Sequence, residues 1–366
     1  MKTFHCTHCQ NLVFFENVKC LNCQRDLAYL PDQMEMAALE KRDDGLWYHE
    51  DQAYKLCANS ISHQICNWAL PAAETEELCR SCRLTHVIPD LSQPGNEEAW
   101  RRLEIAKRRL LYTILALRLP VSGKTAANPS GVEFEFLKDS AEPNGDLSRV
   151  LTGHDNGLIT INVAEADDVY REQQRTKQNE PYRTLLGHFR HEIGHYYWDR
   201  LIENTPRQSE FRELFGDESA DYQAALDIHY RDGPPPNWEN DYVSAYASTH
   251  PWEDWAESWA HVLHMIDALE TAESVGVSIK PLRPDEPAFA ISAPTFTAGT
   301  ADFEEMIRAW LPLTYALNNF TRGLGLADGY PFVLTQRVVG KLRFVYDTIR
   351  QSVTPAEPAS VVQVGG

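Results

Sequence analysis

The sequence lacks three features that would each point to a common class of function. Its 366 residues contain no apolar run approaching the roughly 18 residues that a membrane-spanning helix needs. The first residues, MKTFHCTHCQ, contain neither the apolar core segment nor the small-residue cleavage site of a secretory signal. Basic residues are in deficit, with 34 Lys and Arg against 53 Asp and Glu and a net charge of −19, whereas phosphate binding needs concentrated positive charge. We therefore expect a cytoplasmic protein with no membrane partner, and nucleic acid is not expected as its main partner.

One segment departs from this acidic balance. The run WRRLEIAKRRLLYTILALRL, residues 100–119, has six basic side chains and a single acidic one, Glu104. A polyanion-binding patch is one interpretation. We favour a solvated helix face whose charges pair with the acidic remainder of the chain. The basic side chains are Arg101, Arg102, Lys107, Arg108, Arg109 and Arg118.

Cysteine is absent from most of the chain, because all eight cysteines lie at or before Cys82. A disulfide framework requires an oxidising compartment, and the missing secretory signal argues against one. Two Cys-x2-Cys pairs flank a short segment that includes the strand-like LVFFENV, an arrangement typical of a zinc ribbon in which four thiolates hold one structural zinc ion. The predicted ligands are Cys6, Cys9, Cys20 and Cys23, with His5 and His8 as alternative donors.

The remaining four cysteines predict a second structural zinc site, although only the last pair has the Cys-x2-Cys spacing. Buried thiols without metal are the alternative interpretation. Modules this small bury little apolar surface, so we expect metal to supply their folding free energy. Residues 1–90 carry 8 Lys and Arg against 13 Asp and Glu, a balance of −5, which favours a structural or protein-docking role. The predicted ligands are Cys57, Cys66, Cys79 and Cys82, with His63 as an alternative donor.

The segment TLLGHFRHEIGHYYWDRLI contains the motif His-Glu-x-x-His. Its apolar residues recur at every fourth position, which predicts a helix. On a helix, His191 and His195 lie one turn apart on one face and can bind one metal ion. Glu192 can accept a proton from a zinc-bound water that attacks a carbonyl. Two exposed histidines on an amphipathic helix are the alternative, which the clear helical period and the polar residues downstream disfavour.

A third zinc ligand has to come from further along the chain, because no HExxHxxGxxH continuation follows and the metzincin pattern is therefore excluded. The best region is SAYASTHPWEDWAESWAHVLHMID, and a carboxylate from it would complete a set of two histidines and one glutamate. A second carboxylate one turn on could hold a ligand histidine through its free ring nitrogen. The candidates in this region are Glu253, Glu257, His261 and His264. Other candidates, ranked lower, are Asp217, Glu218 and Asp221, and also His188 and Asp199, which we interpret as neighbouring or surface residues.

The segment SAYASTHPWEDWAESWA resembles the second half of the site in the lethal-factor-type glutamate zincins. That pattern has a tyrosine, a glutamate ligand seven residues later and a further glutamate four residues after that. The resemblance implies that Tyr246 stabilises the oxyanion, that Glu253 is the third zinc ligand and that Glu257 supports a ligand histidine. The sequence differs from the pattern at Asp254, where an aromatic residue is usual.

The chain as a whole resembles a bacterial family of zinc-ribbon-bearing, zinc-binding metallopeptidases, from its paired cysteines through HFRHEIGHYYWD to HPWEDWAESWAH. This resemblance spans most of residues 1–350. It implies the α+β fold class, with a mainly helical zincin-like catalytic domain that follows small zinc-ribbon modules. The predicted domains are a zinc ribbon at 1–35, a second four-cysteine module at 36–90, a linker helix at 91–125, the metallopeptidase domain at 126–350 and a disordered tail at 351–366.

The predicted function is zinc-dependent hydrolysis of peptide bonds in a peptide or protein substrate, with one catalytic and two structural zinc ions. In a zincin fold an edge strand before the active helix pairs with an extended substrate, and we expect Leu158–Ala164 to be that strand. The alternative is a zinc-ribbon scaffold or nucleic-acid module whose HExxH domain is inactive. The combination of Glu192, Tyr246 and Glu253 favours the enzyme, because a scaffold needs none of the three.

Overall fold

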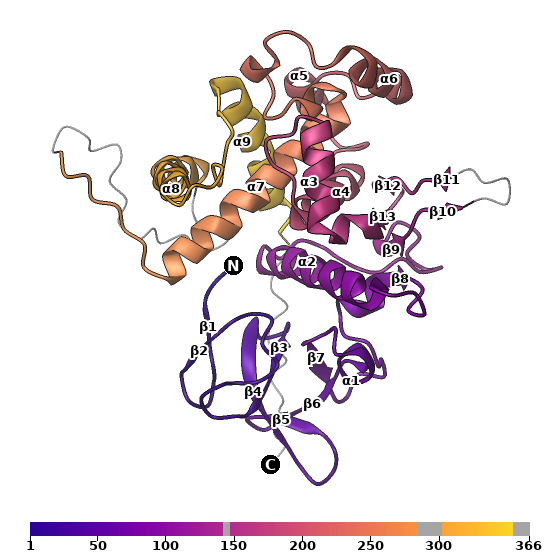
Figure 1. Ribbon diagram of the computed structural model, residues 1–366, viewed down its shortest axis with the longest axis vertical. Helices are drawn as coiled ribbons and strands as arrows, with labels where there is room; N and C mark the ends of the chain where they lie inside the picture. Colours follow the sequence, from indigo (N-terminus) through magenta and orange to yellow (C-terminus); the bar gives the residue numbers. More distant parts are fainter. Residues whose placement is uncertain (142–146, 284–301, 354–366) are drawn as a thin grey trace.

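The computed structural model describes residues 1–141, 147–283 and 302–353. Small sheets form its N-terminal part and helices dominate the rest, so the predicted α+β class is confirmed (Figure 1). The predicted tail lies almost entirely outside the described residues. No helix in the described ranges is long and apolar enough to cross a membrane.

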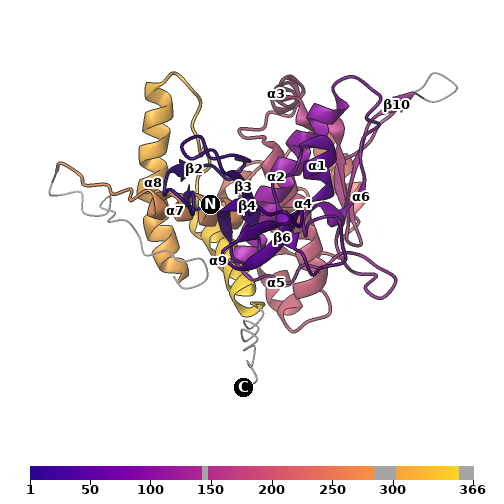
Figure 2. The same cartoon turned by 90° about the horizontal axis from the view of Figure 1, so that it is seen from below.

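The N-terminal region consists of a two-stranded hairpin and a five-stranded antiparallel sheet in the order β3-β4-β5-β6-β7. The sheet is built from short hairpins, with neighbouring strands close in sequence. The first residues lie beside helix α7 (Pro251–Ser274), where the Met1 ammonium donates a hydrogen bond to the Asp267 carbonyl at 2.6 Å (Figures 1 and 2). The elements of this region are β1 (Phe4–His5), β2 (Leu12–Val13), β3 (Asp26–Leu30), β4 (Glu35–Lys41), β5 (Trp47–His49), β6 (Gln52–Leu56), α1 (Ala58–His63), β7 (Ala69–Pro71) and η1 (Cys82–Leu84).

Helix α2 (Asn96–Ala116) joins the sheet region to the rest of the chain, and part of its basic run is internal. Lys107 and Arg108 are buried, so the prediction of a solvated face is wrong for these two side chains. The Lys107 ammonium lies 2.9 Å from the buried Glu104 carboxylate, and the Arg108 guanidinium donates to the Ile65 carbonyl at 2.7 Å. A buried charge is tolerated only when it is paired in this way.

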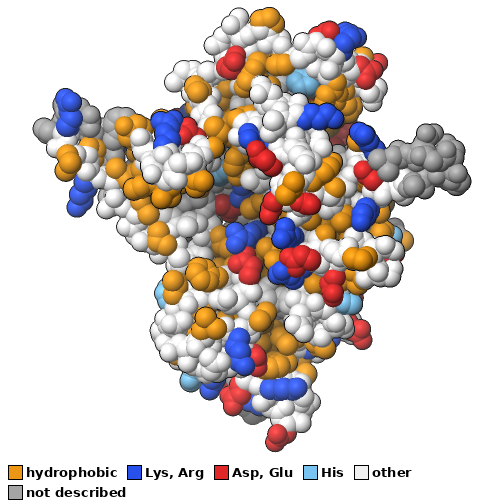
Figure 3. Space-filling model, in the orientation of Figure 1, with side chains coloured by type: hydrophobic (Ala, Val, Ile, Leu, Met, Phe, Trp, Pro, Cys, Tyr) orange, Lys and Arg blue, Asp and Glu red, His pale blue; other side chains and the backbone are white. Residues whose placement is uncertain are grey.

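Three other basic residues of α2 behave as predicted. Arg101 and Arg102 pair with Glu98 on the surface, and Arg109 pairs with Glu16. On the face shown in Figure 3, blue Lys and Arg atoms lie next to red Asp and Glu atoms and do not gather into one continuous basic patch.

A four-stranded sheet in the order β12-β13-β9-β8 follows α2 along the chain, although β8 itself precedes that helix. The predicted substrate strand corresponds to β13, which pairs with β12 on one side and with β9 on the other. The prediction that Leu158–Ala164 forms an edge is therefore wrong, and β12 forms the edge instead. The strands are β8 (Thr85–Val87), β9 (Glu133–Leu137), β12 (Gly153–Asp155) and β13 (Leu158–Asn162), with a separate hairpin of β10 (Ser140–Ala141) and β11 (Leu147–Ser148).

The two helices that carry the candidate site, α4 (Leu185–Leu201) and α7 (Pro251–Ser274), cross at Gly194. A Cβ atom at Gly194 would lie only 3.1 Å from the Ala256 Cα atom, so glycine permits the close approach. The Trp255 indole also donates to the Gly194 carbonyl at 2.8 Å. The other helical elements are η2 (Val163–Ala166), α3 (Asp168–Lys177), α5 (Arg207–Phe215), α6 (Tyr222–Asp232), η3 (Trp238–Asn240), η4 (Tyr246–Ser248), α8 (Phe303–Gly323) and α9 (Gln336–Gln351).

Helix α9 packs on α7 through a buried ion pair that accounts for the unusual residue Asp254. The Lys341 ammonium lies 2.5 Å from Asp254 Oδ2 and donates to the Asp241 carbonyl at 2.7 Å. Burial raises the pKa of Asp254 to about 7, although Lys341 opposes the shift. An aromatic residue at position 254 would leave the buried Lys341 without its carboxylate partner.

Candidate active site

Helix α4 presents the three residues of the HExxH motif. The Thr184 hydroxyl caps the helix by accepting a hydrogen bond from the Gly187 amide at 3.0 Å. One turn apart on the helix, His191 and His195 bring their Nε2 atoms to 3.2 Å from each other. Two imidazole nitrogens this close, both turned to one side of the helix, form one side of a metal site.

Helix α7 supplies a carboxylate to the same point. It begins after His250, whose Nδ1 accepts from the Trp252 amide at 3.2 Å, and Pro251 occupies its first turn. Glu253 is 1% exposed, and its Oε2 atom lies 2.9 Å from His191 Nε2 and 3.6 Å from His195 Nε2. The crossing of α4 and α7 thus brings together three metal-binding side chains from two distant parts of the sequence.

The donor atoms of His191, His195 and Glu253 fit a zinc ion. Tetrahedral bonds of ~2.0–2.1 Å place ligand atoms ~3.3 Å apart, which is close to the three separations in the structure. Burial alone would raise the pKa of Glu253, but the two imidazoles hold that pKa well below its ordinary value. Its Oε2 atom is buried without a hydrogen-bond donor, and a cation between the three side chains would satisfy it.

The free ends of two of these side chains are held by other protein groups. Glu257 Oε1 lies 2.7 Å from His191 Nδ1, and the Ser244 hydroxyl donates to Glu257 Oε2 at 2.7 Å. The Tyr222 hydroxyl donates to Glu253 Oε1 at 2.6 Å, which leaves Oε2 to face the imidazoles. Partners of this kind fix the orientation of metal ligands. Sequence reasoning missed Tyr222 and Ser244, because neither belongs to a motif and both act only through tertiary contacts.

Glu192 and Tyr246 lie next to the three donor side chains. Glu192 is 5% exposed, and burial raises its pKa, a shift that His191 and His195 only partly offset. The Tyr246 ring lies 5.9 Å from the His191 ring, between centroids, at the start of η4. A basic carboxylate and a phenol beside a metal site can accept one proton and donate one hydrogen bond, respectively.

The acidic candidates that the sequence ranked lower lie elsewhere. Glu218 pairs with Arg212 at 2.5 Å, and Asp217 accepts from the Ser219 hydroxyl at 2.7 Å. Asp221 caps helix α6. None of the three carboxylates belongs to a metal-donor group among the residues that the structure describes.

The other candidate histidines, two from the best region and one ranked lower, also have other surroundings. His188 lies 3.1 Å from the buried Glu165 carboxylate, and His261 Nδ1 is hydrogen-bonded to the Tyr330 hydroxyl at 2.8 Å. His264 packs edge-on against the Tyr330 ring, at 5.6 Å between centroids. Within the described ranges these three rings contribute to no group of metal donors.

The edge strand β12 lies beside this site. The His154 ring stacks on the His195 ring at 6.2 Å between centroids, and the Asp199 carboxylate lies 3.8 Å from His154 Nε2. Burial lowers the pKa of His154 to about 3, so its ring is neutral. The outer edge of β12 carries no other strand in the described part of the chain.

The structure brings the eight cysteines into two groups of four, and all are free thiols. The sulfur atoms of Cys6 and Cys23 are 3.7 Å apart, those of Cys9 and Cys20 are 3.6 Å apart, and those of Cys66 and Cys79 are 3.6 Å apart. A tetrahedral zinc site with ~2.3 Å bonds places its sulfurs ~3.8 Å apart, whereas a disulfide requires ~2.05 Å. Both groups therefore fit a zinc site with four cysteine ligands.

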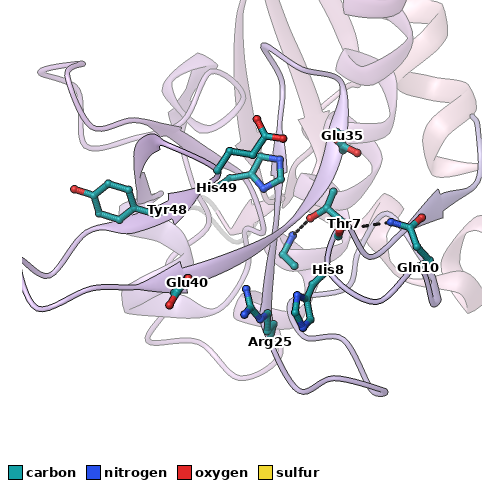
Figure 4. Close-up of a pocket in the computed structure, with 10 residues that line it drawn as sticks. Thr7, His8, Gln10, Arg25, Glu35, Glu40, Tyr48 and His49 are labelled. Carbon is teal, nitrogen blue, oxygen red and sulfur yellow. Dashed lines mark hydrogen bonds between the residues drawn. The ribbon is translucent and has the colours of Figure 1, made fainter.

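The histidines considered as alternative donors lie outside these groups. His8 lies beside Arg25 in a polar hollow of about 500 Å³ (Figure 4). His63 lies 3.7 Å from the Glu97 carboxylate. His5, like the other two, is absent from the donor groups found in the described residues.

Comparison with known proteins gives two family matches. Residues 96–348 match the family described as "Putative zinc-binding metallo-peptidase", and residues 3–93 match a zinc-ribbon domain family. Uncharacterized proteins of Mycobacterium bovis and Mycobacterium tuberculosis are 42% identical over 360 residues, which cover 98% of this chain and 98% of each relative. No solved structure matches the chain at a significant level.

Proposed function

Because the chain belongs to this zinc-binding metallopeptidase family and carries the associated zinc ribbon, we propose that it hydrolyses peptide bonds in peptide or protein substrates. The observation that carries the proposal is the convergence of His191, His195 and Glu253, with a carboxylate oxygen that is buried and lacks a hydrogen-bond donor. A purely structural contact between these helices would not require three metal-binding side chains next to a buried Glu192.

In the proposed mechanism, His191, His195 and Glu253 would hold a zinc ion. A bound zinc lowers the pKa of a coordinated water and polarises the scissile carbonyl. Glu192 accepts the water proton and passes it to the leaving amine, and the raised pKa of its carboxyl suits both steps. The Tyr246 hydroxyl donates a hydrogen bond to the developing oxyanion.

Glu257 and Tyr222 keep the ligands in place during this cycle. Glu257 accepts the Nδ1 proton of His191, which fixes the tautomer that leaves Nε2 free for metal. Tyr222 occupies one oxygen of Glu253, so only the other oxygen is left to bind zinc.

We propose that an extended substrate segment pairs with the outer edge of β12. Supporting this assignment, β12 ends the four-stranded sheet on the side of the site, and the contact between His154 and His195 brings the strand next to the second histidine. Backbone pairing with a free sheet edge binds peptides with little dependence on their side chains.

The two four-cysteine groups are proposed to hold structural zinc, for a total of three zinc ions per chain, and to form a docking region for proteins. Their free thiols support a reducing compartment, which we propose is the cytoplasm.

Removal and return of zinc test the proposal. The purified chain should cleave a mixed peptide library, lose cleavage when a chelator removes the most weakly held zinc ion, and regain cleavage when one equivalent of zinc is added. Zinc content measured at each stage identifies the zinc ion that peptide cleavage requires. Full cleavage by a preparation that retains only two zinc ions would contradict the proposal.

A further inference from the structure

A second cavity, of about 280 Å³, lies where the second four-cysteine module meets helix α2. It is lined by Trp68, by residues that follow Cys79, by one face of α2, and by the segment 121–123 that leads into the catalytic region. None of these residues belongs to the candidate active site. Small-molecule pockets commonly form at such joints between domains, and the volume is just below the ~300–1,000 Å³ range typical of them.

Most of the cavity wall is apolar. Trp68, Leu84 and Leu111 are buried, and Leu115 and Val121 are half-buried. The Trp68 indole Nε1 is buried and has no hydrogen-bond partner. The apolar wall favours an apolar group, because burying apolar surface is favourable in proportion to the area removed from water.

Two arginines complete the lining, and their surroundings differ. The Arg83 guanidinium lies 3.1 Å from the Glu74 carboxylate, so its charge is already paired. Arg80 keeps an exposed surface and forms no hydrogen bond or ion pair within the described ranges of the chain, although the Glu74 carboxylate attracts it from beyond ion-pair distance. No acidic side chain lines the cavity. An unpaired guanidinium beside an apolar wall offers two parallel N–H donors to a carboxylate.

We propose that this cavity binds an apolar group that ends in a carboxylate, with the apolar part against Leu84, Leu111 and Leu115 and the carboxylate on Arg80. A single free arginine matches a single negative charge, whereas a phosphate group would bring more charge than the lining offsets. Two sources share this chemistry: a free small organic acid and the C-terminal residue of a polypeptide.

The occupant would contact the segment that connects the zinc modules to the catalytic helices. The Tyr197 hydroxyl of α4 donates to the Pro120 carbonyl at 3.1 Å, directly before the lining segment, and the Tyr197 ring stacks on Trp259 of α7 at 4.8 Å. The site is independent of the proposed hydrolysis, because none of its residues contacts the two histidines and the glutamate of the metal site.

Four probes test this inference on the full-length, zinc-loaded protein by isothermal titration calorimetry. They are 4-methylpentanoate, its neutral amide, N-acetyl-glycyl-leucine and the C-terminal amide of that dipeptide. At least one acid should bind, and its amide should bind at least about tenfold more weakly, because the amide loses a charge-assisted hydrogen bond. Equal binding of both acids indicates a free acid as the natural occupant, and binding of the dipeptide alone indicates a polypeptide C-terminus.

Variants establish where the probes bind. Arg80→Gln should weaken binding of the acid at least about tenfold while zinc content and the unfolding midpoint stay unchanged. The matched control Arg101→Gln removes an exposed arginine from α2 outside the cavity and should bind the acid normally. Leu115→Trp should fill the cavity and abolish binding. The proposal is overturned if neither acid binds at millimolar concentration, if the amides bind as tightly as the acids, or if Arg80→Gln binds like the wild type.

Discussion

Replacing Glu253 separates the proposed zinc ligand from its helical neighbour Glu257, one turn further along α7. Glu253 approaches both imidazoles, whereas Glu257 approaches one of the two, at His191 Nδ1 on the far side of that ring. Glu253→Ala should therefore leave two zinc ions per chain where the wild type holds three. Glu257→Ala should keep the third ion with affinity reduced about 10- to 100-fold, the usual cost of losing a group that orients a ligand.

Glu253→Ala should also affect protein stability and zinc affinity to different extents. Besides removing one of three donors, Glu253→Ala leaves the Tyr222 hydroxyl without its acceptor, at a cost of ~1–3 kcal/mol if no water replaces it. That cost falls on the apo and the zinc-bound protein alike, so it lowers the free energy of unfolding. The loss of a direct bond to zinc is what should take the loss of affinity beyond the roughly 100-fold upper limit expected for Glu257→Ala.

The assay is zinc content by atomic emission, combined with competition against a chelator of known affinity. The control is Glu213→Ala on α5, an exposed glutamate outside the donor groups, which should keep all three ions. Full retention of the third ion in Glu253→Ala, with loss in Glu257→Ala, would refute the assignment of the two roles.

Three further predictions follow from individual contacts. Tyr246→Phe should keep all three zinc ions and reduce the rate of peptide cleavage about 10²- to 10³-fold, because it removes only the proposed oxyanion donor. Loss of zinc in this variant would contradict the role of Tyr246 as a donor that does not bind the metal. Gly194→Ala should destabilise the protein by about 1–3 kcal/mol in urea denaturation, because the added Cβ atom would lie 3.1 Å from atoms of Ala256 and Trp259. The control Gly340→Ala on α9 should be neutral or stabilising, because no atom lies within 4 Å of its added Cβ atom. Burial lowers the pKa of His261 to about 4 and of His264 to about 3, so the unfolded chain binds these protons first. The contribution of each ring to the free energy of unfolding should be full above pH ~6.5 and fall as the pH drops toward 4, by up to ~1.4 kcal/mol per pH unit. Urea titrations from pH ~7 to ~5 should show this fall as a shrinking difference between the wild type and His261→Gln, and a difference that does not change with pH would contradict the burial of His261 as a neutral ring.

The sequence predicted those features that depend on local spacing. His191 and His195 are four residues apart on a periodic helix, so their shared face follows from helix geometry, and the spacing of the cysteine pairs likewise indicates their grouping. The identity of the third donor depended on resemblance, because helix geometry alone could not separate Glu253 from Glu257. Their roles as ligand and supporting residue remain predictions, as do the predicted domain boundaries.

Features created by tertiary contacts could not be predicted. Lys107 and Arg108 resemble surface charges in the sequence, and only their pairing with the buried Glu104 makes their burial tolerable. The edge of the four-stranded sheet was assigned to the wrong strand because β12 has only three residues, Gly-His-Asp, and shows no alternating apolar pattern. Tyr222 reaches Glu253 across 31 residues of sequence, with no spacing rule that connects them.

The central claim, zinc-dependent peptide hydrolysis with Glu192 as the general base, is tested most directly by comparing protein cleavage in native cell lysate treated with wild type or with Glu192→Gln. The substitution preserves the size of the buried side chain but removes its ability to accept the water proton. We predict new protein N-termini with the wild type, a reduction of at least about a hundredfold with Glu192→Gln, and three zinc ions in both proteins. Equal cleavage by the two proteins would contradict the role of Glu192, and no cleavage by zinc-replete wild type would contradict the proposed activity.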